Sequence, residues 1–277
     1  MKILSISIVL YKTSSSQLKK CINSLQVVER LADLYLIDNS PSTELKKLET
    51  LFKNTKYIFL QSNQGYARGH NKAMEIVLSK NYKYHLVLNP DCYFNGNIIL
   101  ELIKVMNRNE NIGLIMPKVL NPDGTIQNLY KFIPKPSDLI LSFILKSIKL
   151  DSIFKSNHII SGDIHNKPSF IPYLSGCFMF MRLSALRNVG LFDNKFFMYA
   201  EDIDLSRRIS EKYLTIYFPF LYIYHEHGKG SYKSLKLFII HVKNLLIYFN
   251  KWGWFFDKKR VEINQRAITF NKNNYIY

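Results

Sequence analysis

The stretch Tyr84-His85-Leu86-Val87-Leu88-Asn89-Pro90-Asp91 combines a short apolar run with a proline and an acidic residue. Tyr84 to Leu88 has the length and apolar character of a buried strand. Pro90 has no N–H group and cannot continue a strand ladder, so the strand is predicted to stop there. Asp91 then lies just beyond a strand's carboxyl end, where open α/β sheets place their ligands. A carboxylate at this position could hold Mg²⁺ or Mn²⁺ against a diphosphate, since hard cations prefer oxygen ligands.

A second copy of the same tripeptide occurs at Asn121-Pro122-Asp123-Gly124. Its glycine and its polar surroundings are typical of a tight turn. The tripeptide alone is therefore a weak signal, and this copy is interpreted as a hairpin turn only.

Outward from Asp91, strand-like and helix-like segments alternate along the first half of the chain. Strands are predicted at 3–10, 34–37, 57–60, 84–88 and 112–116, and helices at 16–30, 43–53, 65–79 and 98–108. Further strands are expected at 178–181 and 216–224, the latter interrupted at Pro219. Continuous apolar strands alternating with helices indicate an α/β fold with a mostly parallel central sheet flanked by helices.

A second acidic cluster lies far downstream, in Phe197-Met198-Tyr199-Ala200-Glu201-Asp202-Ile203-Asp204-Leu205-Ser206-Arg207-Arg208. If a helix starts at Asp202, its carboxylate lies near unpaired N–H groups and the positive end of the helix dipole, which keeps it ionised as a base requires. Asp204 and Arg208 are then partners four residues apart that can brace it. A capped, solvated helix start would show the same residues.

Composition limits the partners and the compartment. The chain has 277 residues, a formal net charge of +17 and a calculated pI near 9.6, which favours an anionic partner. The lysines are scattered, and no nucleic-acid-binding motif is recognisable. Cys21, Cys92 and Cys177 are widely spaced and contain no CxxC, as expected of buried thiols in a reducing cytosol. The amino-terminal apolar run is interpreted as a strand, because it is too short to span a bilayer and lacks a signal-peptide cleavage site.

The middle and the end of the chain lack the alternation of strand-like and helix-like segments seen in the first half. A short amphipathic helix is expected at 139–145, followed by a polar loop at 156–167. From Ser231 to Phe256 apolar residues recur at helix spacing between lysines, and aromatic residues follow. Such a basic amphipathic helix can lie on an anionic membrane or pack on its own domain, and the two roles are compatible.

Taken together, the motifs resemble those of the family 2 glycosyltransferases with the GT-A fold, in particular their bacterial rhamnosyltransferase-like branch. The resemblance rests on the order of the motifs at 9–12, 37–40, 63–71, 88–91, 175–179, 189–193 and 201–204, and on His225. It implies a domain at 1–230, with a nucleotide-sugar-binding half (1–118) and an acceptor-binding half (119–230). A carboxyl-terminal amphipathic helical tail would follow at 231–277.

The resemblance also implies residue roles. Tyr11 and Asp38, after the first two strands, would hold the nucleotide, although Asp38 could simply close a turn before Pro41. The segment 63–71 would lie over the nucleotide and sugar, with contacts from Asn63, Gly65, Arg68 and Asn71. Lys72 follows this segment where the family usually has glycine.

Asn89-Pro90-Asp91 occupies the place of the family's DxD metal motif, with Asn89 as a neutral ligand at best. Asp91 and His225 would hold the Mg²⁺ or Mn²⁺ ion, and His227 is an alternative ligand. Asp202 matches the catalytic base. Glu201 or Asp204 could instead orient the acceptor or brace Asp202.

The implied reaction is an inverting transfer of a hexose, with L-rhamnose from dTDP-β-L-rhamnose favoured, onto a growing, lipid-linked cell-surface polysaccharide. The expected location is the cytoplasmic face of the cell membrane, by peripheral attachment, and a homodimer is left open. One alternative keeps the fold but uses UDP-galactose, UDP-glucose or UDP-galactofuranose. Another is a non-catalytic nucleotide-binding module, which Asn89 favours. A nucleic-acid-binding protein would rest on charge alone.

Overall fold

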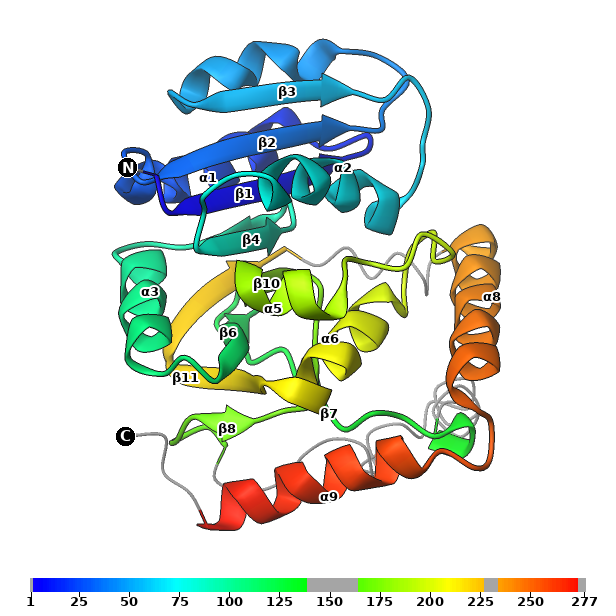
Figure 1. The fold of residues 1–277 in the computed structure, drawn as a ribbon. Helices are drawn as coiled ribbons and strands as arrows, with labels where there is room; N and C mark the ends of the chain where they lie inside the picture. Colours follow the sequence, from blue (N-terminus) through cyan, green and yellow to red (C-terminus); the bar gives the residue numbers. More distant parts are fainter. Residues whose placement is uncertain (1, 139–163, 227–233, 274–277) are drawn as a thin grey trace.

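The computed structural model describes residues 2–138, 164–226 and 234–273. Within these residues a nine-stranded sheet runs in the order β3-β2-β1-β4-β10-β6-β11-β5, with β8 paired to β11 (Figure 1). Its strands are β1 (Leu4–Leu10), β2 (Ala32–Asp38), β3 (Thr55–Phe59), β4 (Tyr84–Leu88), β5 (Cys92–Tyr93), β6 (Ile112–Leu120), β8 (Ser169–Phe170), β10 (Phe178–Arg182) and β11 (Leu214–His225). A small ribbon joins β7 (Tyr130–Lys131) to β9 (Tyr173–Leu174).

Helices flank this sheet, as the sequence predicts (Figure 1). The helices are α1 (Ser15–Ser24), α2 (Tyr66–Leu78), α3 (Ile98–Arg108), α5 (Leu183–Val189), α6 (Glu201–Lys212), α8 (Leu235–Trp252) and α9 (Lys258–Asn273), with 3₁₀ turns η1 (Gln26–Val28) and η2 (Glu44–Leu51). The predicted helix at 43–53 is thus a 3₁₀ helix, and the predicted helix at 16–30 ends at Ser24 before a 3₁₀ turn. The expected α/β fold is confirmed.

The amino-terminal half of the sheet is parallel. β1 pairs in parallel with β2 and β4, and β2 with β3. Every residue of β4 is buried, and β1 is buried except for the partly buried Val9, which explains why these strands read as continuous apolar runs. Their carboxyl ends therefore lie along one edge of the sheet.

β10 runs against its neighbours. It is antiparallel to both β4 and β6, so Phe178 lies opposite Leu88 and Arg182 opposite Tyr84. The chain thus enters β10 at the edge where β4 leaves the sheet. The expected parallel arrangement holds on both sides of β10, since β6 and β11 are parallel to each other.

Two prolines shape the β6–β11 pair. β6 continues through Pro117 to Leu120, beyond the predicted end at Met116. β11 is one strand, but the register jumps between Phe218, opposite Pro117, and Tyr222, opposite Lys118. The interruption expected at Pro219 is therefore a bulge. The hairpin turn expected at 121–124 is also present, closed by a 2.7 Å hydrogen bond from the Asn121 N–H to the Thr125 carbonyl.

The carboxyl-terminal helices pack on the domain. Leu245, Tyr248 and Phe249 of α8 and Ile263 of α9 form a second apolar core with four residues outside the tail: Ile133, Phe196, Ala200 and Ile203. The expected helical tail is therefore two helices, α8 and α9, which pack against residues between 133 and 203. The segment predicted as an amphipathic helix at 139–145, and most of the expected loop at 156–167, lie outside the described residues.

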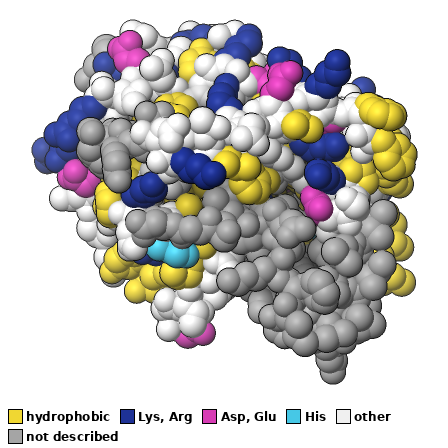
Figure 2. Space-filling view, turned by 90° about the horizontal axis from the view of Figure 1, so that it is seen from below, with side chains coloured by type: hydrophobic (Ala, Val, Ile, Leu, Met, Phe, Trp, Pro, Cys, Tyr) yellow, Lys and Arg dark blue, Asp and Glu magenta, His cyan; other side chains and the backbone are white. Residues whose placement is uncertain are grey.

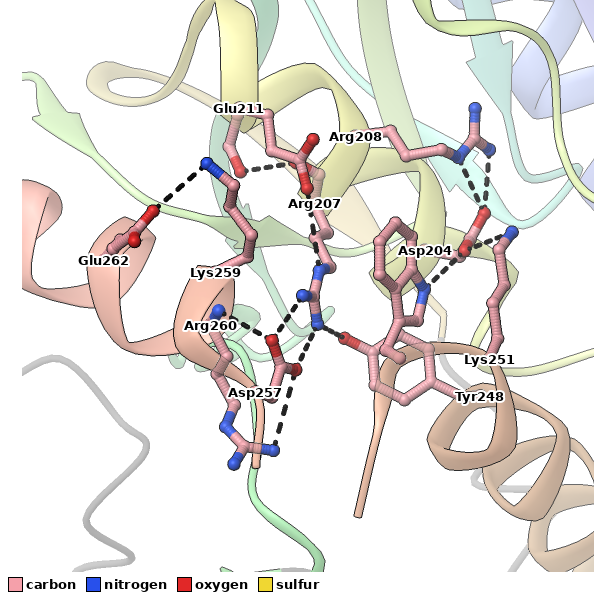
Figure 3. A network of polar contacts seen from close by, with 12 residues as sticks. Asp204, Arg207, Arg208, Glu211, Tyr248, Lys251, Asp257, Lys259, Arg260 and Glu262 are labelled. Atoms are coloured by element: carbon pink, nitrogen blue, oxygen red, sulfur yellow. Dashed lines mark hydrogen bonds and ion pairs between the residues drawn. The ribbon is translucent and has the colours of Figure 1, made fainter. Parts of the chain in front are cut away.

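Polar contacts join α6 to these two helices (Figure 3). The Arg207 guanidinium donates two hydrogen bonds, of 2.6 and 2.7 Å, to the two carboxylate oxygens of Asp257. Both side chains are almost fully buried, at 1% and 3% exposure. Such a bidentate pair offsets its desolvation only while both partners are present.

The surface shows two further features. On the face in Figure 2, lysine and arginine side chains are dispersed and do not gather into one patch. Among the helices of the described segments, each is too short or too polar to cross a bilayer.

We expect Arg207→Ala to destabilise the protein by up to about 3–5 kcal/mol, because the buried Asp257 carboxylate loses both guanidinium hydrogen bonds and keeps only the Arg260 N–H at 2.9 Å and the Arg260 guanidinium at 3.8 Å. Urea unfolding followed by circular dichroism measures this. The matched control is Lys104→Ala, which removes an exposed ion pair with Glu101 and should change stability by about 0.5 kcal/mol or less. Similar effects of the two substitutions would contradict the assigned role of the buried pair.

Candidate active site

The loops after β1, β2 and β3 are joined at the carboxyl edge of the sheet. The Lys12 N–H donates to Ser40 Oγ (3.1 Å), and Asn39 Nδ2 donates to the Gly65 carbonyl (3.0 Å). Tyr11 follows β1 with 47% of its surface exposed. The residues predicted to hold the nucleotide therefore lie together, with the Tyr11 ring accessible.

Asp38 is fully buried at the end of β2. One carboxylate oxygen accepts the Ser40 N–H at 2.8 Å, which is the turn considered as its alternative role. The other accepts the Tyr57 hydroxyl. Asp38 thus shapes the loop, and its contact with a nucleotide stays a prediction.

The segment 63–71 docks on the chain that leads to α6. Asn63 is exposed and its Oδ1 accepts the Gly65 N–H (3.0 Å). Gly65 has φ +87°, and a Cβ there would lie 2.2 Å from the Phe197 carbonyl oxygen, so glycine is required. The next N–H, of Tyr66, donates to that same carbonyl at 2.7 Å.

Two predicted donor-binding residues of α2 extend this contact. Asn71 Nδ2 donates to the Phe192 carbonyl at 2.8 Å, and Asn71 Oδ1 accepts the Phe192 N–H at 3.1 Å. Arg68 is exposed, and its Nε donates to the Asn194 carbonyl (3.2 Å). The structure therefore assigns both side chains a contact with the 192–194 loop, and a contact with a phosphate or sugar stays a prediction.

Asp202 lies in the first turn of α6. Its Oδ2 accepts the Gly176 N–H at 3.0 Å and lies 3.4 Å from the Tyr173 hydroxyl, while Oδ1 accepts the Ile203 N–H at 2.9 Å. The two residues that lead into α6, Tyr199 and Ala200, both have positive φ, 74° and 66°. Such left-handed backbone is costly for residues with a side chain and is concentrated at functional sites.

Glu201 and Asp202 have different surroundings. Burial raises the pKa of both carboxyls, and repulsion from Asp202 adds to the effect on Glu201, whose pKa lies well above its ordinary value. The backbone N–H groups of Gly176 and Ile203 oppose this shift at Asp202. Glu201 Oε2 is buried and accepts no hydrogen bond within the described residues. These surroundings therefore favour the neutral form at Glu201 more strongly than at Asp202.

Asp204 is fully buried and faces the carboxyl-terminal helices (Figure 3). Arg208 Nε (2.9 Å) binds one carboxylate oxygen, as the predicted partner four residues on. Lys251 Nζ and Trp252 Nε1, both at 2.8 Å, bind the other. These contacts tie α6 to α8, and a role for Asp204 in bracing Asp202 stays a prediction.

Asp91 and His225 come together from opposite halves of the chain. Asp91 Oδ1 lies 3.3 Å from His225 Nε2, while His225 Nδ1 lies 3.0 Å from Gln127 Oε1. Because Gln127 Oε1 can only accept, Nδ1 carries a hydrogen, and Nε2 is the ring nitrogen that faces Asp91. Burial alone would lower the pKa of His225, but Cys177 and Asp91 outweigh burial and raise it. The pair therefore favours a positive charge between its members.

This donor pair fits a divalent cation. Two adjacent ligands of an octahedral Mg²⁺ or Mn²⁺ site, with bonds of about 2.1 Å, lie roughly 3 Å apart, close to the observed separation. Asn89 is only partly buried, and its backbone N–H donates to the Cys177 carbonyl at 2.9 Å. His227, the alternative ligand, lies outside the described residues.

The two acidic sites are anchored on neighbouring residues. Gly176 holds Asp202 through its N–H, and Cys177 holds the 89–91 loop through its carbonyl. A Cβ at Gly176 would lie 3.4 Å from Asp202 Cβ and 3.2 Å from the Tyr66 hydroxyl, which itself donates to the Gly176 carbonyl. The regions around Asp91 and Asp202 are therefore both attached to the turn before β10.

Sequence reasoning missed three residues of this site. Gln127 orients His225, and it follows the segment 121–124, which the sequence predicts to be a hairpin turn only. Tyr66 and Tyr173 contact Gly176 and Asp202. Tyr66 and Gly176 lie inside the motifs at 63–71 and 175–179, so the sequence carries a signal for both. Nothing in the sequence around Gln127 or Tyr173 marks those two residues.

Comparison with known proteins gives consistent matches. The sequence model of glycosyl transferase family 2 matches residues 5–190. The low-salt glycan biosynthesis hexosyltransferase Agl10 of Haloferax volcanii is 30% identical over 77% of this chain, which spans 63% of that protein. The rhamnosyltransferase WbbL of Escherichia coli K12 is 27% identical over 83% of this chain and 87% of its own length.

Solved structures support the same fold. TarS of S. aureus in complex with UDP superposes with a TM-score of 0.57 at 13% identity, covering 98% of this chain and 71% of that one. GalNAc-T7 with UDP, GalNAc and Mn²⁺ gives 0.59 at 16% identity, covering 81% and 44%. The expected GT-A architecture is thereby confirmed.

We expect Glu201→Gln to flatten the dependence of stability on pH. Because the folded-state pKa of Glu201 is raised, its protonated form stabilises the fold. That contribution is present at low pH and is lost as pH rises from about 4.5, the unfolded value, toward the raised folded value. Melting temperatures across this range should fall less steeply in the variant than in the wild type. The exposed pair at Glu262 provides the control substitution, Glu262→Gln, and identical slopes for Glu201→Gln and wild type would refute the assignment.

Proposed function

The chain belongs to glycosyl transferase family 2, and we propose that it transfers L-rhamnose from dTDP-β-L-rhamnose, with inversion, to a lipid-linked cell-surface glycan. The choice of rhamnose is supported by relatives named rhamnosyltransferases. Besides WbbL, they include the N-acetylglucosaminyl-diphospho-decaprenol L-rhamnosyltransferase of Mycobacterium tuberculosis, 25% identical over 61% of this chain and 56% of its own length.

One observation carries the assignment of a transferase. A partly buried carboxylate held by backbone donors, Asp202, and a cation-compatible pair, Asp91 with His225, are fixed to the adjacent residues Gly176 and Cys177. A base for the acceptor and a charge for the leaving group are the two requirements of glycosyl transfer. A non-catalytic nucleotide-binding module would need only the second.

In the proposed reaction Asp202 takes the proton from an acceptor hydroxyl. That oxygen then attacks the anomeric carbon from the face opposite the nucleotide, and the bond from this carbon to the diphosphate oxygen breaks. Burial raises the pKa of Asp202, which makes it a stronger base, and the raised pKa of Glu201 favours its neutral form, which would add no competing negative charge. Asp204 positions the helix that carries both.

Asp91 and His225 would hold the Mg²⁺ or Mn²⁺ ion, with Gln127 fixing the imidazole. When bound, the ion neutralises charge on the departing diphosphate. Tyr11, Asp38, Asn63, Gly65, Arg68, Asn71 and Asn89 border the donor site in this proposal.

A UDP-hexose donor is the second candidate. It is supported by the name of the hexosyltransferase Agl10 and by the UDP in the TarS structure. The same Asp202 and Asp91 would act on either donor, so donor choice would lie in the shape of the sugar and base pockets.

Attachment to the cytoplasmic face of the membrane is the third part of the proposal. α8 and the turn after it expose large apolar side chains, while neighbouring lysines would meet anionic lipid headgroups. The exposed apolar residues are Leu235, Ile239, Leu246, Phe255 and Phe256. A lipid-linked acceptor would be reached from such a position.

We expect Asp202→Asn to lower the transfer rate by ~10²–10⁴, the usual worth of a general base, while donor affinity is retained. Transfer is assayed with dTDP-rhamnose, and donor binding with Mn²⁺ is measured by calorimetry against a panel of dTDP- and UDP-sugars. The panel also decides between the two donor classes. A parallel loss of donor affinity would place Asp202 at the nucleotide and not at the acceptor.

For the cation site the chain supplies its own control, the second Asn-Pro-Asp. Asp91→Ala should weaken Mn²⁺-dependent donor binding by ~10–100-fold, whereas Asp123→Ala, in the exposed turn, should leave it unchanged. Wild-type activity that persists in excess EDTA would remove the cation from the proposal.

A further inference from the structure

Three potential metal ligands meet beside the proposed cation site. β5 pairs with the end of β11, which places Cys92 opposite His225, and Cys177 lies just before β10. One ligand atom from each of Cys92, Cys177 and His225 lies within 4.8 Å of the others. All three residues are buried, at 0%, 3% and 4% exposure. Three strand ends thus bring two thiols and one imidazole together.

Asp91 lies beside His225, next to the three mutually close ligands, and would approach the ion as a fourth donor. Its Oδ1 is 3.3 Å from His225 Nε2 and accepts no hydrogen bond in the described part of the chain. With 23% of its side chain exposed, Asp91 is the most accessible member of the group. An ion could therefore reach the thiols from the side of Asp91.

This donor set suits a softer ion than magnesium. Thiolate and imidazole ligands select Zn²⁺, whereas Mg²⁺ and Mn²⁺ prefer oxygen. Around tetrahedral Zn²⁺, with bonds of about 2.3 Å to sulfur and 2.0–2.1 Å to nitrogen, donor atoms lie roughly 3.5–3.8 Å apart. Atoms already within 4.8 Å need only small side-chain rotations to reach that spacing.

We propose that Cys92, Cys177, His225 and Asp91 form a Zn²⁺ site. Binding replaces the thiol protons, so two protons leave to solvent for each ion bound, and the 3.5 Å contact of Cys92 Sγ with the Cys177 carbonyl is given up. His225 and Asp91 belong to both metal sites. Zn²⁺ therefore excludes the Mg²⁺ or Mn²⁺ that supports donor binding, a consequence that rests on the proposed function.

The third cysteine provides the matched control. Cys21 is also buried and free, and its Sγ lies 3.6 Å from the Asn89 carbonyl, but it is not one of the three clustered ligands. All three thiols are therefore buried near Asp91, but only those of Cys92 and Cys177 belong to the cluster.

The test uses Co²⁺ as a spectroscopic substitute for Zn²⁺ on the purified, reduced protein. Wild type and Cys21→Ser should show thiolate-to-cobalt charge-transfer absorption that one equivalent of Zn²⁺ abolishes. Each of Cys92→Ser and Cys177→Ser removes one of the two thiolates, so either variant should show at most about half of this absorption and bind Zn²⁺ at least ~10-fold more weakly. Circular dichroism confirms that the variants are folded. The zinc site is refuted if folded wild type shows no thiolate absorption. It is also refuted if Cys92→Ser and Cys177→Ser absorb as strongly as wild type.

Donor binding separates the two proposals. Calorimetry with Mn²⁺ and the nucleotide sugar should show donor binding to wild type, and one equivalent of Zn²⁺ should abolish it. Cys92→Ser should retain donor binding in the presence of the same amount of Zn²⁺. Absence of donor binding in zinc-free wild type would refute the proposed function while leaving the cobalt result intact. Unaltered donor binding in zinc-loaded wild type would refute the shared use of His225 and Asp91.

Discussion

The turn formed by Gly176 and Cys177 is the constraint on which the site depends. The N–H of one residue binds the Asp202 carboxylate, and the carbonyl of the next binds the backbone of the 89–91 loop. Because β10 runs antiparallel between β4 and β6, this turn is delivered to the edge where β4 ends. Acidic groups separated by more than a hundred residues are thereby held by one short piece of backbone, with little freedom to move apart.

The strained approach to α6 is stabilised from the carboxyl-terminal helices. Asn244 of α8 donates to the Met198 carbonyl at 2.6 Å, directly before the two residues with positive φ. Asp204 and Arg207 are then bound by Lys251, Trp252 and Asp257 (Figure 3). Left-handed backbone persists where surrounding contacts over-determine it. These helices are therefore part of the catalytic architecture proposed here, whatever further contact α8 makes with lipid.

Much of this arrangement could be read from the sequence, for physical reasons. Buried parallel strands produce continuous apolar runs, and helix geometry makes Asp204 and Arg208 neighbours. The direction of β10 could not be read, because a five-residue apolar run looks the same in either orientation. The role of Gln127 was missed since it depends on a partner 98 positions away. α9 was not recognised as a separate helix because it buries few side chains: Arg260, Ile263 and Ala267. The pairing of Arg207 with Asp257 is equally non-local.

The dependence of α6 on Asp257 has a consequence for how the molecule is made. On the ribosome the sheet strands emerge first, and amino-terminal segments begin to fold before the end of the chain is synthesised. Until α8 and α9 appear, the Arg207 guanidinium lacks Asp257, and the Asp204 carboxylate keeps Arg208 but lacks Lys251 and Trp252. The amino-terminal strands can thus pack early, while α6 gains its buried polar partners only after α8 and α9 have been synthesised.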